Sequence, residues 1–312
     1  MNPIRKFVDF FERRSHEADS PKPSKQKQLN KDATDEWLLR TLAGPKDLTF
    51  LPASAATAIR DRFEEDVTVF TRGGGVRSVK CVGEANPAFV SACFFFAAFL
   101  DEYTGRTNDE IAVYYCDALP DVKTLSSDLS PETLNSGVTF FRRGRGPGRE
   151  GPVVVVYRSE EAPKVAFHEL IHAYGIDRAP SFRAASAALE RIACGFGMAS
   201  EVEIRAQETY TELLAAICHT VYSERDLGKL FEFFVAQSDK LLCVHGTNIR
   251  QRTHAIEYVV AKAALVKDVD EKEEVVDLFD SHERFCEALG PRFEAYVGGY
   301  RCTMRSLYYA ST

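Results

Sequence analysis

Apolar residues in the first half of the chain follow two different spacings. Spacings of three or four residues, which are typical of helices, occur near 35–43, 54–65 and 86–103. Short apolar runs bounded by Gly- and Pro-rich breaks indicate strands, and they occur at 67–71, 77–82, 111–118, 137–143 and 152–158. We therefore expect helices and strands to mix between residues 35 and 160.

After residue 160 the helical spacing continues almost to the end of the chain. The predicted helices lie near 161–174, 181–194, 200–223, 226–242, 249–266, 271–289 and 291–299. The two patterns together predict an α+β fold, with a mixed sheet plus helices in the N-terminal half and an all-helical C-terminal half. We place an α+β subdomain at 37–178 and a helical subdomain at 179–312.

The first 36 residues predict two further segments. Residues 1–14 form an amphipathic helix whose apolar stripe contains Ile4, Phe7, Val8, Phe10 and Phe11. Such a helix either docks on the body of the protein or makes a reversible contact with a membrane or a partner. Residues 15–36 are polar and contain Lys, Ser and Pro, which is typical of a flexible linker.

Length, charge and cysteine content narrow the class of protein. A chain of 312 residues can bury a sizeable core without disulfides. Its eight cysteines are scattered without a C-x-x-C pair, so we expect them to be reduced core residues. The net charge of −7 argues against a nucleic-acid-binding surface, and no nucleic-acid partner is expected.

Neither a membrane span nor an export signal is predicted. The longest apolar run, 87–100, is shorter than the roughly 20 residues that cross a bilayer, so it is expected to be a buried helix. The N-terminus lacks the apolar region and cleavage site of a signal peptide. We therefore expect an intracellular, cytoplasmic protein.

The stretch KVAFHELIHAYGIDR, at 164–178, contains the pattern H-E-x-x-H. On a helix His168 and His172 share one face, with Glu169 beside them. Two imidazoles spaced in this way can reach one Zn²⁺ ion, and the adjacent glutamate can take a proton from a zinc-bound water. The pattern predicts a hydrolytic zinc centre; the alternative is a solvated helix face with two incidental histidines.

The residues around the motif favour the zinc centre. A Val-rich run at 152–158 precedes it, and as the presumed edge strand of the sheet it would hold an extended substrate. An acidic helix start with Pro163, and Gly175 as a helix stop, bound the motif helix. Four arginines beside this strand could attract an acidic substrate or simply be solvated: Arg142, Arg143, Arg145 and Arg149.

A zinc site of this kind needs a third protein ligand. Arg178 stands where metzincins have their third histidine, so that class is excluded. On the later helix 200–220, Glu208 and Glu212 share a stripe with Glu201. We predict Glu208 as the ligand and Glu212 as the partner that orients a ligand histidine through its free ring N–H. The reverse assignment, Glu203 as ligand, and a merely solvated acidic face remain alternatives.

The segments HELIHAYGI (168–176) and ETYTELLAA (208–216) resemble the gluzincin zinc metallopeptidases. The first is similar to the light chains of clostridial neurotoxins, and the second to the ImmA/IrrE-type peptidases. This resemblance implies a zincin-like fold in which a sheet with helices precedes the motif, a helical subdomain follows it, and the metal lies in the cleft between them.

The resemblance also implies a reaction. Zn²⁺ held by His168, His172 and Glu208 would activate a water, and Glu169 would act as general base in hydrolysing peptide bonds of an intracellular protein. The alternative is a zinc-binding, catalytically inactive scaffold or partner-binding protein. Spacing does not choose the residue that stabilises the oxyanion; the candidates are His219, His245, His254, Tyr300 and Arg301.

Overall fold

A computed structural model describes most of the chain, in two compact units. The described residues are 1–15, 24–28, 30–44, 50–64, 66–72, 78–106, 111–119, 128–142, 151–246, 249–269 and 271–310. Unit 1 comprises Met1–Phe11, Thr124–Leu134 and Ile176–Thr312, and unit 2 comprises Glu12–Lys123 and Asn135–Gly175.

Unit 2 is built on a six-stranded mixed sheet with strand order β1-β2-β3-β4-β7-β6. The strands are β1 (Ser24–Gln28), β2 (Val67–Thr71), β3 (Ser78–Val82), β4 (Ala112–Tyr115), β6 (Gly137–Phe140) and β7 (Val153–Val156). The central strands β3, β4 and β7 are parallel, whereas β1, β2 and β6 pair antiparallel with their neighbours. Every residue of β4 and β7 is buried, as expected for parallel strands covered on both faces.

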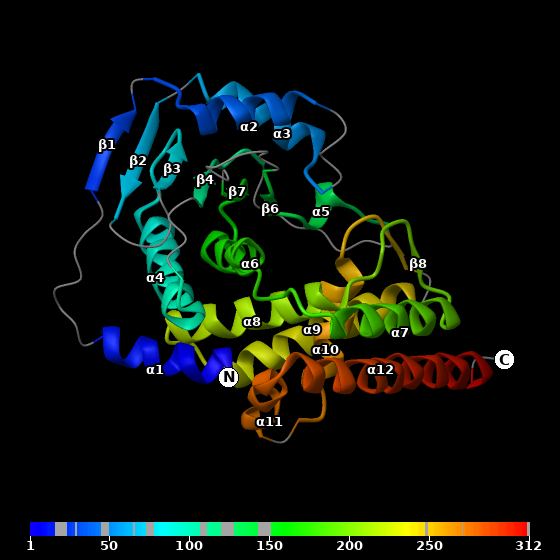
Figure 1. Cartoon of the computed structure of the whole chain (residues 1–312). Coiled ribbons are helices and arrows are strands. Elements are labelled where there is room, and N and C mark those ends of the chain that lie inside the picture. The colour runs from blue at the N-terminus through cyan, green and yellow to red at the C-terminus, as the bar shows by residue number, and fades with distance from the viewer. Residues whose placement is uncertain are drawn as a thin grey trace. The chain divides into compact units, whose positions relative to one another are not determined.

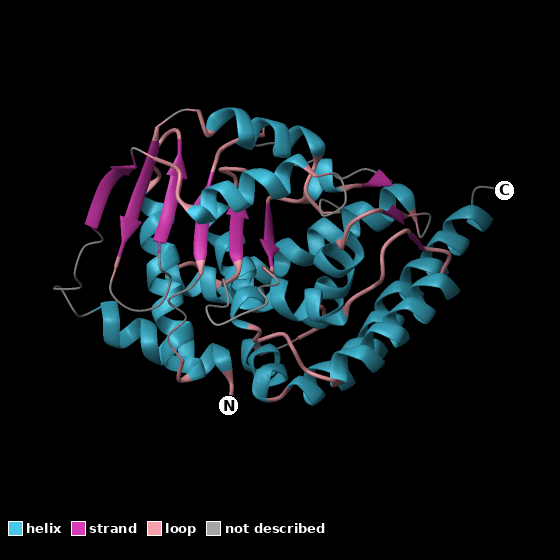
Figure 2. Ribbon diagram, turned by 45° about the horizontal axis from the view of Figure 1, so that its top comes forward, coloured by secondary structure: helices cyan, strands magenta, loops and turns pink. Residues whose placement is uncertain are grey.

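Helices cover both faces of this sheet (Figures 1 and 2). They are α2 (Ala33–Ala43) and α3 (Ala53–Arg62) on one face, and α4 (Pro87–Thr104) and α6 (Ala162–Tyr174) on the other. Because side chains alternate along a strand, Tyr114 packs in one core with residues of α2 and α3, while Tyr115 contacts Phe89 of α4. Phe96 stacks on Phe167 with ring centroids 4.0 Å apart and joins α4 to α6.

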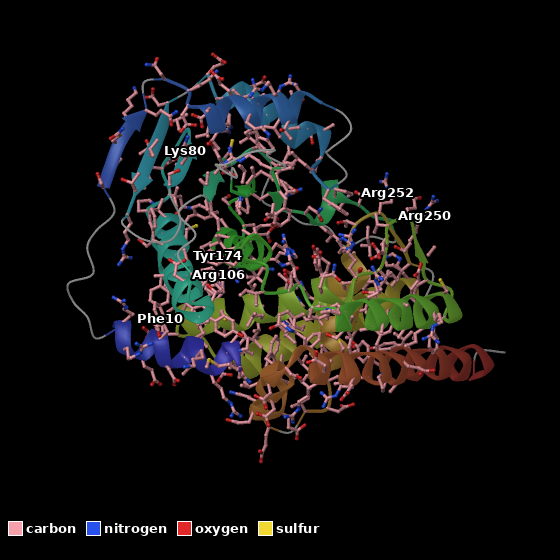
Figure 3. The ribbon with its side chains drawn as sticks, viewed as in Figure 1. Phe10, Lys80, Arg106, Tyr174, Arg250 and Arg252 are labelled. Carbon is pink, nitrogen blue, oxygen red and sulfur yellow. The ribbon has the colours of Figure 1, made fainter. Side chains whose placement is uncertain are left out.

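An ion network with a buried centre, Lys80 and Asp35, ties the start of α2 to the sheet. The ammonium group of Lys80, which is labelled in Figure 3, donates to Asp35 at 2.8 Å and to Asp32 at 2.7 Å. The hydroxyl of Tyr114 also donates to Asp35, at 2.7 Å. Asp32 is the N-cap of α2 and accepts from the backbone N–H groups of Thr34 and Asp35. Each buried charge thus has a partner, as burial requires.

Unit 1 consists mainly of helices. They are α1 (Pro3–Ser15, in this unit to Phe11), α5 (Pro131–Leu134), α7 (Ser181–Gly195), α8 (Ala206–Tyr222), α9 (Leu227–His245), the π-helix η2 (Ile256–Ala261), α10 (Lys262–Val266), α11 (Lys272–Asp277), the 3-10 helix η3 (Leu278–Asp280) and α12 (His282–Ala310). A small parallel sheet of two-residue strands accompanies them, in the order β5 (Asp128–Leu129), β9 (Arg250–Gln251) and β8 (Ala199–Ser200).

Most of the apolar stripe of α1 is buried, while Val8 and Phe11 are partly exposed. Ile4, Phe7 and Phe10 are 0–2% exposed. The side chain of Asn2 donates to the backbone carbonyl of Val276 at 2.7 Å, which fixes the start of the helix on unit 1. This burial supports the docked arrangement of residues 1–14 over contact with a membrane.

The expected mixture of helices and strands is present, and the sheet is mixed, but four details of the prediction are wrong. The C-terminal half is not all-helical, because it contains β8 and β9. Part of the predicted linker 15–36 is the edge strand β1, whose polar side chains are mostly exposed and whose main chain pairs with β2. An edge strand held by backbone hydrogen bonds leaves no apolar pattern to detect.

The other two details concern helices of unit 1. The predicted helix 249–266 begins as β9 and continues as η2 and α10. The predicted break before Pro291 is absent, because α12 runs through this proline. Neither a π turn nor a tolerated proline changes the spacing of apolar residues enough to be recognised.

The apolar run at 87–100 is a core helix, as predicted. It lies in α4, where Phe89, Phe96 and Phe99 are buried. Within the described ranges, no helix combines the length and apolar character needed to cross a membrane. The cysteines whose side chains are described are all free, and Cys81, Cys93, Cys116 and Cys218 are buried as expected. The expectation of core residues is wrong for Cys194 and Cys243, which are exposed.

Candidate metal centre

The helix that carries the H-E-x-x-H motif, α6, has clear local signals at both ends. Pro163 lies in its first turn, where a missing N–H costs nothing. Gly175 ends it with φ of 70°, a left-handed conformation that glycine adopts without strain, and its N–H donates to the carbonyl of His172 at 3.0 Å. The hydroxyl of Tyr174 donates to Asp101 of α4 at 2.8 Å and fixes the last turn. The predicted bounds of this helix are confirmed.

The two motif histidines converge. The Nε2 atoms of His168 and His172 lie 3.0 Å apart, and their rings are inclined by 73°. Two nitrogen ligands at about 2.0–2.1 Å from a tetrahedral zinc ion lie roughly 3.3 Å apart. The observed spacing therefore fits two imidazoles that face one ion. His168 is only 6% exposed, so the alternative of a solvated helix face is wrong for this residue.

Glu169 is buried beside the edge strand β6. The hydroxyl of Thr139 lies 2.7 Å from its Oε2 and 3.0 Å from its backbone oxygen, and can donate to either. A Cβ atom added at Gly137 would lie 2.6 Å from Cγ1 of Val165 and 3.1 Å from Oε1 of Glu169. Only glycine permits β6 to approach α6 this closely, and the approach places the Thr139 hydroxyl on the carboxylate of Glu169.

Two carboxylates on α8 are buried as well. Glu208 and Glu212 are each 6% exposed, so a solvated acidic face is excluded for them. The hydroxyl of Tyr258 donates to Oε2 of Glu208 at 3.2 Å, and the ammonium group of Lys262 donates to Oε1 of Glu212 at 3.0 Å. Lys262 also stands over the ring of Phe234, 3.8 Å from its centroid. A buried carboxylate needs such donors, because burial disfavours its charged form.

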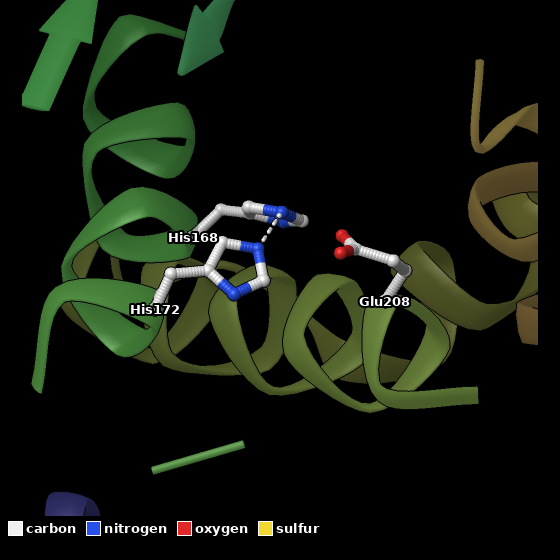
Figure 4. A group of neighbouring side chains, drawn as sticks. All are labelled: His168, His172 and Glu208. Atoms are coloured by element: carbon white, nitrogen blue, oxygen red, sulfur yellow. Dashed lines mark hydrogen bonds between the residues drawn. The ribbon is translucent and has the colours of Figure 1, made fainter. Parts of the chain in front are cut away.

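One ligand atom from each of His168, His172 and Glu208 lies within 4.8 Å of the other two (Figure 4). Two imidazole nitrogens and one carboxylate oxygen are a common zinc donor set, and three protein ligands leave a fourth position for water or substrate. The three residues that the sequence predicts as ligands therefore form a group whose chemistry fits Zn²⁺. Glu212, the predicted orienting residue, lies one turn farther along α8.

The other glutamates considered as ligands lie elsewhere. Glu201 and Glu203 precede the first residue of α8 and are exposed. Glu203 pairs with Arg205 at 3.2 Å, and Glu201 pairs with Arg250. Neither side chain shares the buried stripe of Glu208.

Among the oxyanion candidates, His254 is the one that the structure links to Glu208. It is 4% exposed, and its Nδ1 lies 3.0 Å from Oε1 of the fully buried Glu257. Burial lowers the pKa of His254, but the charge of Glu208 and the hydrogen bond with Glu257 outweigh burial and raise it above the ordinary value. His219 lies near Ser223, and Tyr300 donates to Asp239. The side chain of Arg301 lies outside the described residues.

The presumed edge strand is not at the edge. The Val-rich run is β7, which pairs with β4 on one side and β6 on the other. Its four residues are fully buried, which explains the continuous valines. The edge strand beside α6 is β6. Of the four arginines near it, Arg142 donates to the carbonyl of Gly151, and the other three lie outside the described residues.

Three residues that hydrogen-bond the carboxylates of the site were not predicted from the sequence: Tyr258, Lys262 and Thr139. One signal was present: Tyr258 and Lys262 are four residues apart, the same spacing as Glu208 and Glu212, and lysine complements the charge of glutamate. Thr139 lies in a predicted strand, but nothing in its pattern indicates which helix it faces.

Comparison with known proteins found no matching family model, no matching curated protein and no matching solved structure. The functional assignment therefore rests on the residues and their geometry.

Proposed function

We propose that this chain is a zinc-dependent metallopeptidase of the gluzincin type. The observation that carries the proposal is the group formed by His168, His172 and Glu208, whose ligand atoms lie within 4.8 Å of one another. Glu169, adjacent to the first ligand, supplies the general base that such a reaction needs. When bound, Zn²⁺ would supply Lewis-acid activation of a water and of the scissile carbonyl.

In this proposal Glu169 moves the proton. Its carboxylate takes a proton from the attacking water and delivers it to the leaving amine, so that the amine departs in its neutral form. The hydrogen bond from Thr139 to Oε2, at 2.7 Å, orients this carboxylate. Burial of Glu169, at 7% exposed, keeps competing water away from the carboxylate.

We propose that a peptide substrate binds in an extended conformation along the edge strand β6. Its inner side pairs with β7, and at an edge the other side offers backbone N–H and C=O groups to an extended peptide. Thr139 of β6 hydrogen-bonds Glu169, so a peptide on this strand would pass beside the general base. A protein substrate with an accessible extended segment is therefore the proposed substrate class.

Replacing Glu169 by Gln tests the proposal. The variant keeps the size of the side chain but cannot accept a proton, so we expect bound zinc at about one ion per chain and at least a roughly 100-fold loss of peptide hydrolysis. Zinc is measured by mass spectrometry of the purified protein. Hydrolysis is measured by labelling new protein N-termini in a cell lysate treated with wild-type protein or the variant.

His168→Ala serves as the control for metal binding, because it removes a ligand and is expected to lose most of the zinc. Cleavage by Glu169→Gln at the wild-type rate would contradict the mechanism. Wild-type protein that binds zinc but generates no new N-termini would favour the inactive scaffold instead.

A further inference from the structure

Two buried carboxylates of α8 meet two donors that have the same spacing. Glu208 and Glu212 are four residues apart, and so are Tyr258 and Lys262, which donate to them at 3.2 Å and 3.0 Å. The first donor lies in the π-helix η2, and the second is the first residue of α10. These two elements thus run alongside α8 with their polar residues in register.

The register between η2 and α8 is held by further buried hydrogen bonds. Oε1 of Glu257 accepts from the backbone N–H of Arg205, the N-cap residue of α8, at 2.8 Å. The hydroxyl of Thr209 donates to the carbonyl of Glu257 at 3.5 Å. Glu257 is fully buried, so these bonds are shielded from water. Together they fix the residue next to Tyr258 against the first turn of α8.

A π turn is rare, and where it occurs it is frequently at a functional site. In η2 it allows Glu257 and Tyr258, which are neighbours in the chain, to reach α8 at two different residues, Arg205 and Glu208. The turn therefore places the hydroxyl of Tyr258 on the carboxylate of Glu208.

A tyrosine hydroxyl carries one hydrogen and can donate one hydrogen bond. Donation to Oε2 of Glu208 engages that oxygen. It also restricts rotation of the carboxylate, which would otherwise present either oxygen, or both, to an ion. Hydrogen bonds of this kind to ligating carboxylates orient them, and their loss typically weakens metal binding about 10- to 100-fold.

We propose that Tyr258 is a positioning residue for the metal ligand Glu208. Its hydroxyl holds Oε2 and so restricts rotation of the carboxylate that would bind the ion, and η2 fixes the hydroxyl in place. This inference rests on the proposed function in one respect, the assignment of Glu208 as a zinc ligand.

The test compares zinc affinity in wild-type protein, Tyr258→Phe and Tyr296→Phe. Affinity for Zn²⁺ alone is measured by competition with a chromophoric chelator, so no substrate is needed. Tyr258→Phe is expected to bind zinc about 10- to 100-fold more weakly. Tyr296→Phe is the matched control, because it removes another buried hydroxyl of unit 1, the one that donates to Asp239 at 2.7 Å. Its zinc affinity is expected to equal that of the wild type.

A second comparison separates positioning from a general structural effect. In a Glu208→Ala background, Tyr258→Phe should cause no further loss of zinc affinity, because the hydroxyl acts through the carboxylate that is already absent. Equal losses in both backgrounds would overturn the inference, and so would a Tyr258→Phe variant that binds zinc as tightly as the wild type. Failure of the wild type to bind zinc would instead overturn the proposed function.

Discussion

At the scale of single residues, the candidate centre depends on small distances between α6 and its neighbours. Gly137 permits the close approach of β6 to α6, because a Cβ at this position would meet Val165 and Glu169. Thr139, two residues later on the same face of β6, uses this approach to reach the carboxylate of Glu169. The proposed general base is thus positioned by a glycine and a threonine.

Replacing Gly137 by Ala tests this close approach. The added Cβ would lie 2.6 Å from Cγ1 of Val165, so β6 and α6 must separate, and we expect a loss of about 1–3 kcal/mol in the free energy of unfolding. Urea denaturation measures the loss. Gly195→Ala is the control, since a Cβ there meets nothing within 4 Å. Equal stability of Gly137→Ala and wild type would show that β6 does not pack on α6 as described.

At the scale of elements, α2 is anchored at its first residues by charge as well as by capping. Asp32 combines two tasks: it accepts backbone hydrogen bonds as the N-cap, and it accepts from Lys80 of β3. Burial raises the pKa of Asp32, but the hydrogen bonds from Lys80 and from the backbone of Asp35 outweigh burial and lower it. The charged form of Asp32 is therefore favoured by folding, which makes this anchor depend on pH.

The variant Asp32→Asn is expected to separate capping from ion pairing. Asparagine is also a good N-cap, but its neutral side chain cannot form an ion pair with Lys80. Since the pKa of Asp32 is lower in the folded than in the unfolded state, its charge stabilises the fold above the unfolded pKa of about 3.9 and stops doing so as pH falls through the folded pKa. The side chain is 51% exposed, so we expect a loss of only about 0.5–1 kcal/mol at pH 7.

Urea denaturation at a series of pH values checks this expectation. The difference between wild type and Asp32→Asn should persist down to about pH 5 and shrink below about pH 4. Asp61→Asn, at an exposed position of α3, is expected to show little difference at any pH. A difference between wild type and Asp32→Asn that grows on acidification would contradict the assigned direction of the pKa shift.

At the scale of the whole molecule, some features were predictable because local spacing encodes them. The two histidines and Glu208 belong to helices whose period is visible in the sequence, so their shared faces could be derived. The buried strands could be recognised by continuous valines. In contrast, β1 is polar and η2 has an apolar pattern close to that of an α-helix, so neither leaves a distinctive local signal.

The hydrogen-bond partners that site residues find in distant segments could not be derived from the sequence. Tyr258 and Lys262 follow Glu208 and Glu212 by 50 residues, and only the packing of η2 and α10 on α8 brings them together. The edge position of β6 likewise depends on strand order, which the composition of a strand does not reveal. Spacing therefore predicts which residues share a face, and the tertiary fold decides which faces meet.

In the proposed centre, His168, His172 and Glu208 together hold one zinc ion. Anomalous diffraction at the zinc absorption edge, from crystals of zinc-loaded wild-type protein, tests it most directly. We expect one strong peak in contact with Nε2 of both histidines and with one carboxylate oxygen of Glu208, at about 2.0–2.2 Å from each. A peak bound by Glu212 in place of Glu208, or no peak at the two histidines, would contradict it.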